Sequence, residues 1–261
     1  GDSLKEIRAN RKKLIADQEA EQETLVEVRE RRSAAQARLT VLEDLEVKQE
    51  GVGIGVREIL QRAKTSDFPP WNGITGSVAD LLDVDLENAA LLEVALGNRA
   101  QLIVMHDLAP MIDYLKRGSA RIDGRVGFLG LDEVATSESA ESTSNDIDLS
   151  SDVDVIFRAD QLVSKSCQHP TLAAMLLDMT WVVTDLDAAN RLAVAEGSGH
   201  RFITLQGELI DSDGTLYAGT VRGEASVLSR KSELRRLKND LIRMGQQLTT
   251  SEARSKAFTN Q

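Results

Sequence analysis

Residues 73–107, GITGSVADLLDVDLENAALLEVALGNRAQLIVMHD, decide the fold of this chain. Their centre, 86–96, carries apolar residues at helical spacing, and Gly97 follows where a glycine most easily ends a helix. Apolar runs at 78–84 and 102–105 each predict a strand. This strand–helix–strand unit has little polar surface on its inner elements, so it needs a second layer to be stable.

A weak copy of the unit follows at 157–186, FRADQLVSKSCQHPTLAAMLLDMTWVVTDL. Ala79 and Asp80 correspond to Ala159 and Asp160, and the strand-like run at 103–104 corresponds to 182–183. Two similar half-domains predict a pseudo-symmetric α/β (α+β) module. The same patterns predict helices at 56–64, 107–117 and 185–196, and strands at 126–129, 201–205, 208–210 and 215–217.

Residues from about 50 to 234 resemble the hinge domain of SMC proteins, the chromosome-organising ATPases. The resemblance rests on short pieces in a fixed order: LEVALG at 92–97 with Gln101 and Val104, YLK at 114–116, GR at 124–125 with FL at 128–129, TL at 204–205 with GEL at 207–209, Gly214, Gly219, and Leu228 with Arg230, Glu233 and Leu234. Two positions depart from the family pattern. Ala218 stands where the first of two glycines is usual, and Gly130 stands where proline is usual.

The resemblance implies a toroidal homodimer in which the first half-domain of one chain pairs with the second of the other. Such a hinge joins two ATPase arms into a ring or V that encloses DNA. Family glycines lie at the dimer contact, which carries over to Gly214, Gly219 and Gly223. ATP hydrolysis belongs to head domains elsewhere in such proteins, so no enzyme activity and no cofactor are expected for this segment. The implied location is the cytoplasm, in association with the nucleoid.

Two long helices are expected to flank the module. Positions 4–42 follow an alternating three-four spacing without Gly or Pro, and 227–248 continue it, which is typical of a coiled coil. The alternative is an amphipathic helix lying on a globular core. Helices that leave and re-enter one globular insert must run antiparallel. The chain is therefore divided into an outgoing arm (1–50), a first hinge subdomain (51–131), an acidic linker (132–155), a second hinge subdomain (156–226) and a returning arm (227–261).

Charge is unevenly distributed along the chain. The net charge of −11 alone argues against nucleic-acid binding, but residues 132–154 hold eight Asp and Glu and no Lys or Arg. That segment predicts a surface connection. A basic stretch begins the returning arm and predicts a weak, sequence-independent DNA contact, with a solvated helix face as the alternative. Its residues are Arg222, Arg230, Lys231, Arg235, Arg236 and Lys238.

No motif for catalysis or metal binding is complete. The glycines at 51–55 miss the GxGxxG spacing, and the DSDG at 211–214 predicts a hairpin turn rather than a calcium loop. Cys167 and His169 are only two ligands, too few for a metal site, and a lone cysteine is typical of a reducing compartment. No run of about 18 apolar residues indicates a membrane span. The rival interpretation is a small α/β enzyme or ligand-binding domain with helical extensions, which a deep polar pocket would favour.

Overall fold

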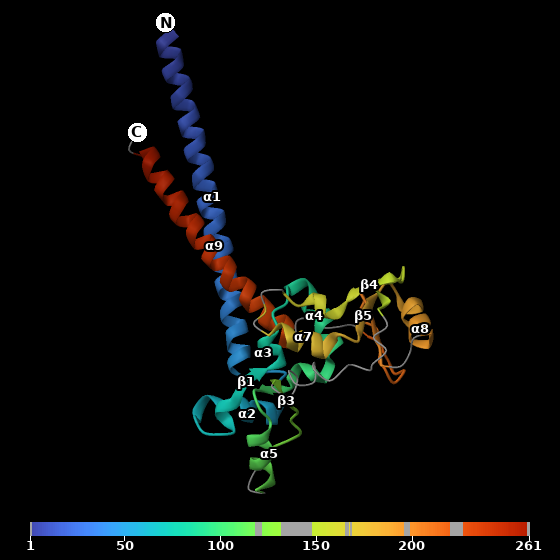
Figure 1. The fold of residues 1–261 in the computed structure, drawn as a ribbon. Coiled ribbons are helices and arrows are strands. Elements are labelled where there is room, and N and C mark those ends of the chain that lie inside the picture. Colours follow the sequence, from blue (N-terminus) through green and yellow to red (C-terminus); the bar gives the residue numbers. More distant parts are fainter. Residues whose placement is uncertain are drawn as a thin grey trace. The chain divides into compact units, whose positions relative to one another are not determined.

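The computed structural model describes residues 2–117, 122–131, 148–164, 167, 169–195, 199–219 and 227–259. The chain forms two compact units (Figure 1). One is helical and combines residues 1–48 with 233–261, and the other is globular and spans 49–232. Each is described by itself below.

The helical unit consists of α1 (Asp2–Val47) and the larger part of α9 (Val227–Thr259). Leu25, Leu39 and Leu42 of α1 are buried, as are Leu234 and Leu248 of α9. Exposed ion pairs flank this seam: Arg29 to Glu252 at 2.9 Å and Lys238 to Glu43 at 3.1 Å. Because higher numbers on one helix face lower numbers on the other, the helices run antiparallel. The predicted coiled coil is confirmed.

The buried part of the seam on α1 extends from Leu25 to Leu42. Leu14, at another seam position, is 41% exposed. It lies about four turns from Arg29, whereas the described part of α9 extends about two turns past Glu252, the partner of Arg29.

The first half of the globular unit is built on a three-stranded sheet in the order β1-β2-β3. β2 is antiparallel to β1 and parallel to β3. The elements of this half are α2 (Ile54–Thr65), a 3₁₀ turn (Trp71–Gly73), β1 (Ile74–Ser77), α3 (Val78–Leu81), α4 (Leu86–Leu96), a 3₁₀ turn (Gly97–Gln101), β2 (Ile103–Met105), α5 (Ala109–Lys116) and β3 (Phe128–Gly130). The C-cap glycine predicted for α4 is confirmed, because Gly97 has a φ of +53°.

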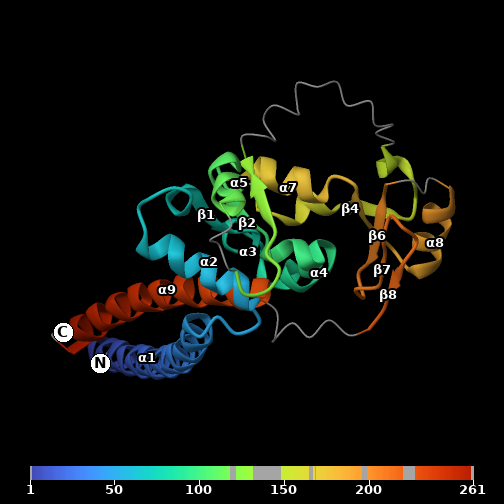
Figure 2. The same ribbon diagram turned by 90° about the horizontal axis from the view of Figure 1, so that it is seen from below.

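The second half repeats this topology and extends it. Its sheet has the order β4-β5-β6-β7-β8, in which β5 is antiparallel to β4 and parallel to β6. Figure 2 shows β6, β7 and β8 side by side. The elements are a 3₁₀ turn (Leu149–Ser151), β4 (Val155–Arg158), a 3₁₀ turn (Ala159–Leu162), α7 (Pro170–Leu177), β5 (Thr180–Val183), α8 (Leu186–Ala195), β6 (Arg201–Thr204), β7 (Leu209–Ile210) and β8 (Leu216–Tyr217). β1 and β4 even share a register shift at the same place, which confirms the internal repeat.

The strand predicted at 78–84 is wrong. Residues 78–81 form α3, and Val84 makes an isolated bridge to Val163. The Asp80 carboxylate accepts hydrogen bonds from the Ser77 amide at 2.9 Å and the Ser77 hydroxyl at 2.6 Å. This closes the first turn of a helix and outweighs the strand tendency of the apolar run. The strand of this half, β1, lies just before it.

One hydrophobic core joins the halves. Leu92 and Ala95 of α4 share a cluster with Leu172 of α7 and Ile203 of β6. The Ser164 amide donates to the Asp83 carbonyl at 2.7 Å across the same boundary. Each of the two half-domains thus supplies the second layer that the other needs.

The end of the predicted acidic linker contacts the second half-domain. Leu149 is buried against Trp181 and Leu192, and the Asp148 carboxylate accepts from the Ser150 amide at 3.0 Å. The last part of the segment therefore packs with the second half-domain, because Leu149 is buried in the core of that half-domain. Residues 132–147 lie outside the described residues.

Candidate functional site

The open edge of the second sheet is formed by β8. Within the described residues this strand pairs only with β7, through Leu209 with Tyr217 and Ile210 with Leu216. Leu216 and Tyr217 are 52% and 54% exposed. An edge strand presents a row of unpaired backbone groups, which another strand can complete. Two exposed apolar side chains on opposite faces of the edge make it a candidate contact surface.

Gly214 and Gly219 flank this edge strand, and both have a positive φ. Gly214 has a φ of +83° and its amide donates to the Asp211 carbonyl at 2.9 Å, which confirms the predicted hairpin turn. Gly219 has a φ of +136°, and no described atom lies within 4 Å of where its Cβ would be. Its own chain therefore does not require a missing side chain there for space. Gly223, the third predicted contact residue, lies outside the described residues.

The start of α9 is anchored to the first half-domain by polar contacts. The Glu93 carboxylate of α4 accepts from the amides of Val227 and Leu228, at 3.3 and 3.1 Å. These amides begin a helix and have no partner within it, so a carboxylate is favoured at this position. The Arg230 guanidinium donates to the Glu50 carbonyl at 2.8 Å, and the Lys231 ammonium donates to the Asp80 carboxylate.

Asp80 thus binds α3 and α9 with one carboxylate. Burial raises the pKa of this carboxyl, but the charge of Lys231 and the hydrogen bonds from Lys231 and Ser77 outweigh burial, so the pKa lies below its usual value. The carboxylate is therefore charged at neutral pH and contributes to the stability of the globular unit.

Most of the predicted DNA-contact residues are already engaged. Arg230 is only 5% exposed, and Lys231 is bound to Asp80. Further along α9, Arg236 lies 3.8 Å from Asp240 and Lys238 pairs with Glu43, but both basic side chains are more than half exposed. Arg235 is partly buried. Arg222 lies outside the described residues.

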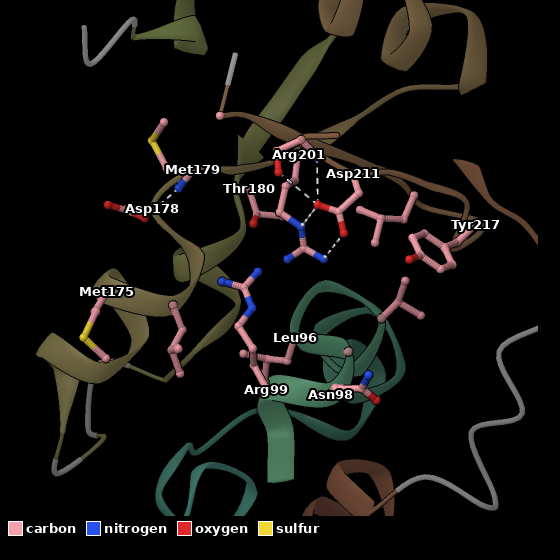
Figure 3. A pocket seen from close by; sticks show the side chains of 16 residues that line it. Leu96, Asn98, Arg99, Met175, Asp178, Met179, Thr180, Arg201, Asp211 and Tyr217 are labelled. Atoms are coloured by element: carbon pink, nitrogen blue, oxygen red, sulfur yellow. Dashed lines mark hydrogen bonds and ion pairs between the residues drawn. The ribbon is translucent and has the colours of Figure 1, made fainter. Parts of the chain in front are cut away.

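A cavity of about 670 Å³ lies between the two half-domains and was not predicted (Figure 3). It is lined by the end of α4, the residues after α7, and strands of the second sheet. Arg201, at the start of β6, is 8% exposed and pairs with Asp211 at 3.1 Å. Its lining residues come from positions 94 to 217, so no local spacing could have revealed it.

The chain is similar in sequence to known proteins. The profile of the family described as "SMC proteins Flexible Hinge Domain" matches residues 71–193. The chain is 34% identical over 215 residues to the chromosome partition protein Smc of Rhodopirellula baltica, covering 82% of this chain and 17% of that protein. It is 31% identical over 208 residues to Smc of Desulfitobacterium hafniense, covering 78% of this chain and 17% of that protein.

A solved structure agrees with the sequence relatives. It is the SMC hinge domain of Geobacillus stearothermophilus, described as an asymmetric dimer. The TM-score is 0.73 at 28% sequence identity, and the match covers 95% of this chain and 97% of that one. The chain belongs to the SMC hinge family.

The geometry of this SMC hinge limits the other interpretations. Cys167 is buried and its thiol donates to the Leu81 carbonyl at 3.2 Å. Among the described residues, no group of three or more His, Cys, Asp and Glu could hold a metal ion. No helix in the described part of the chain is long and apolar enough to cross a membrane.

Proposed function

We propose that this SMC hinge pairs two copies of a chromosome partition protein and joins their coiled-coil arms into a ring or V that encloses DNA. The observation that carries the proposal is the exposed apolar edge of β8 in a chain of this family. The relatives named chromosome partition protein, and the related hinge described as a dimer, support it. The chain spans 17% of the length of the curated relatives, so the activity of the longer protein is itself part of the proposal.

The hinge has a mechanical rather than a catalytic role in this proposal. ATP hydrolysis would belong to head domains in the longer protein, and this segment would need no cofactor. The protein would act in the cytoplasm on the nucleoid. The anchored start of α9 supports a mechanical role, because Glu93 and Asp80 hold the first turn of this helix on the first half-domain.

A weak contact with DNA forms the second part of the proposal. The exposed charges of Arg236 and Lys238 support it, and Arg222 and Arg235 are its other candidates. Arg230 and Lys231 would contribute mainly by holding the start of α9, since both already bind acceptors within the hinge. Such a contact would be independent of sequence and would weaken as salt rises.

Solution mass tests the pairing. Light scattering over a wide dilution range is expected to give a dimer at micromolar concentration. Leu216→Lys with Tyr217→Lys places two charges on the β8 edge, where burial in a contact would cost several kcal/mol per charge, and should give a folded monomer. Val194→Lys changes an even more exposed apolar residue on α8 and should remain a dimer. A monomeric parent at all concentrations, or an unaffected edge variant, would contradict the proposal.

A further inference from the structure

The cavity between the half-domains has the size and lining of a small-molecule site. Its volume of about 670 Å³ lies within the range of roughly 300–1,000 Å³ that such sites occupy. Both halves contribute to it (Figure 3). Its lining is mixed: Arg99, Arg201 and Asp211 lie between Met175 and Met179 on one side and Tyr217 on the other in Figure 3. Its apolar lining residues include Leu96, Met175, Met179, Leu209 and Tyr217.

The two arginines that line the cavity differ in how many of their hydrogen-bond donors are occupied. Arg201 donates to the Asp211 carboxylate at 3.1 and 3.5 Å and to the Ala95 carbonyl at 2.5 Å, so its donors are largely occupied. Arg99 points toward this pair (Figure 3). Its guanidinium makes no hydrogen bond or ion pair with any residue that the structure describes.

The nearby carboxylates already have other partners. Asp211 also accepts from the Ser212 amide at 2.7 Å, and Asp178 accepts from the Met179 amide at 2.8 Å. Burial, and then the charge of Arg201, lower the pKa of Arg99 despite the attraction of both aspartates. Arg99 is therefore a partly desolvated cation with unused donors, next to a second cation.

We propose that this cavity binds a small organic anion, with its phosphate or carboxylate on Arg99 and its apolar body against Leu96, Met175 and Tyr217. A guanidinium offers donors in a planar fork that matches both anionic groups. A bound anion would relieve the repulsion between Arg99 and Arg201, and the apolar lining residues would favour a ligand with an aromatic or aliphatic part. The site goes beyond the pairing function and shares Tyr217 with the proposed β8 contact.

Binding of simple anions to the whole chain tests the site. The probes are phenyl phosphate and benzoate, which have an apolar body, and inorganic phosphate and acetate, which do not. Calorimetry and arginine side-chain NMR signals should show phenyl phosphate or benzoate binding more tightly than its small counterpart. Which of the two binds better distinguishes a phosphate ligand from a carboxylate ligand. No binding at roughly 10 mM of any probe would overturn the proposal.

Variants assign the binding to Arg99. Arg99→Gln should weaken it by about tenfold or more, and Arg99→Lys by less, because a charged hydrogen bond is lost in the first and the fork in the second. Arg117→Gln, an exposed arginine at the end of α5, should bind as the parent does. Melting curves and dimer mass of the variants should match the parent. Unchanged binding in Arg99→Gln, or loss of the dimer in that variant, would overturn the proposal, the latter because the cavity would then belong to the subunit contact.

Discussion

The Asp80 carboxylate connects two helices of this hinge, α3 and the start of α9. It closes the first turn of α3 through Ser77 and binds Lys231 in the first turns of α9. We expect Asp80→Asn to lower the free energy of unfolding by about 1–3 kcal/mol at pH 7, because hydrogen bonds to a charged group are lost. Chemical denaturation monitored by circular dichroism measures this.

The effect should depend on pH with a definite sign. The folded pKa of Asp80 is depressed, so its contribution is present above the unfolded pKa of about 3.9 and is lost as pH falls through the folded value. The gap between parent and variant should therefore narrow on acidification below about pH 4. Asp67→Asn, on an exposed residue, is the control and should leave stability unchanged. A gap that persists at low pH would show that the carboxylate charge is not the cause.

Single residues also mark where prediction from sequence ends. The Ser-x-x-Asp pattern at Ser77 and Asp80 is a signal for the start of a helix, but it overlaps the apolar run at 78–84, which is typical of a strand. The partner of Asp80 lies 151 positions away at Lys231, and no local pattern links them. The same holds for Arg99 and Arg201, which meet only because two half-domains pack together.

At the scale of elements, the long and regular ones were predictable. The α1 and α9 seam follows from a spacing repeated over many turns, and α4 follows from its periodicity and Gly97. The prediction of short elements was less successful, because α3 and β1 have four residues each and contain too few positions to show a period. The repeat was recognisable because the same core positions recur in both halves, as Val104 and Val182 do.

Substitutions at Gly219, beside the edge element β8, distinguish the effect of backbone strain from the effect of contact with a partner chain. Its φ of +136° is unfavourable for other residues, and the space around it is open within the described chain. Gly219→Ala should therefore destabilise each chain by about 1–3 kcal/mol yet keep the dimer. Gly219→Glu with Gly223→Glu should give a folded monomer, since charge would be buried in the contact.

Circular dichroism and sedimentation distinguish these outcomes. The alanine variant is the matched control, because it shares the strain at position 219 without the charge. An intact dimer in the double glutamate variant would mean that these glycines serve only the backbone of their own chain. A monomeric alanine variant would instead place the partner within contact distance of the Cβ.

For the whole molecule, the net charge of −11 does not show that acidic and basic residues gather in different parts of the chain. Eight acidic residues lie between positions 132 and 154. The exposed basic residues Arg236 and Lys238 lie instead on the helical unit. A polyanion such as DNA responds to local charge within about 10 Å at moderate salt rather than to the total. An acidic chain can therefore still bind DNA through one helix face.

Neutralising that face tests the DNA contact. Arg236→Gln with Lys238→Gln should reduce affinity for a short duplex at low salt and make the salt dependence shallower by about one to two units of log–log slope. Glutamine is preferred to glutamate here, because a new negative charge beside Asp240 and Glu43 would disturb the helix pair itself. Lys231 is left unchanged, since its loss would release Asp80 and confuse folding with binding.

Arg254→Gln with Lys256→Gln removes the same charge from exposed positions further along α9 and serves as the control. Fluorescence anisotropy at several salt concentrations measures all three proteins. If the contact is local, only the first pair changes the slope, because counterion release depends on which phosphates are neutralised. Equal losses in both variants would indicate attraction by overall charge, and equal binding in all three would remove Arg236 and Lys238 from the DNA contact.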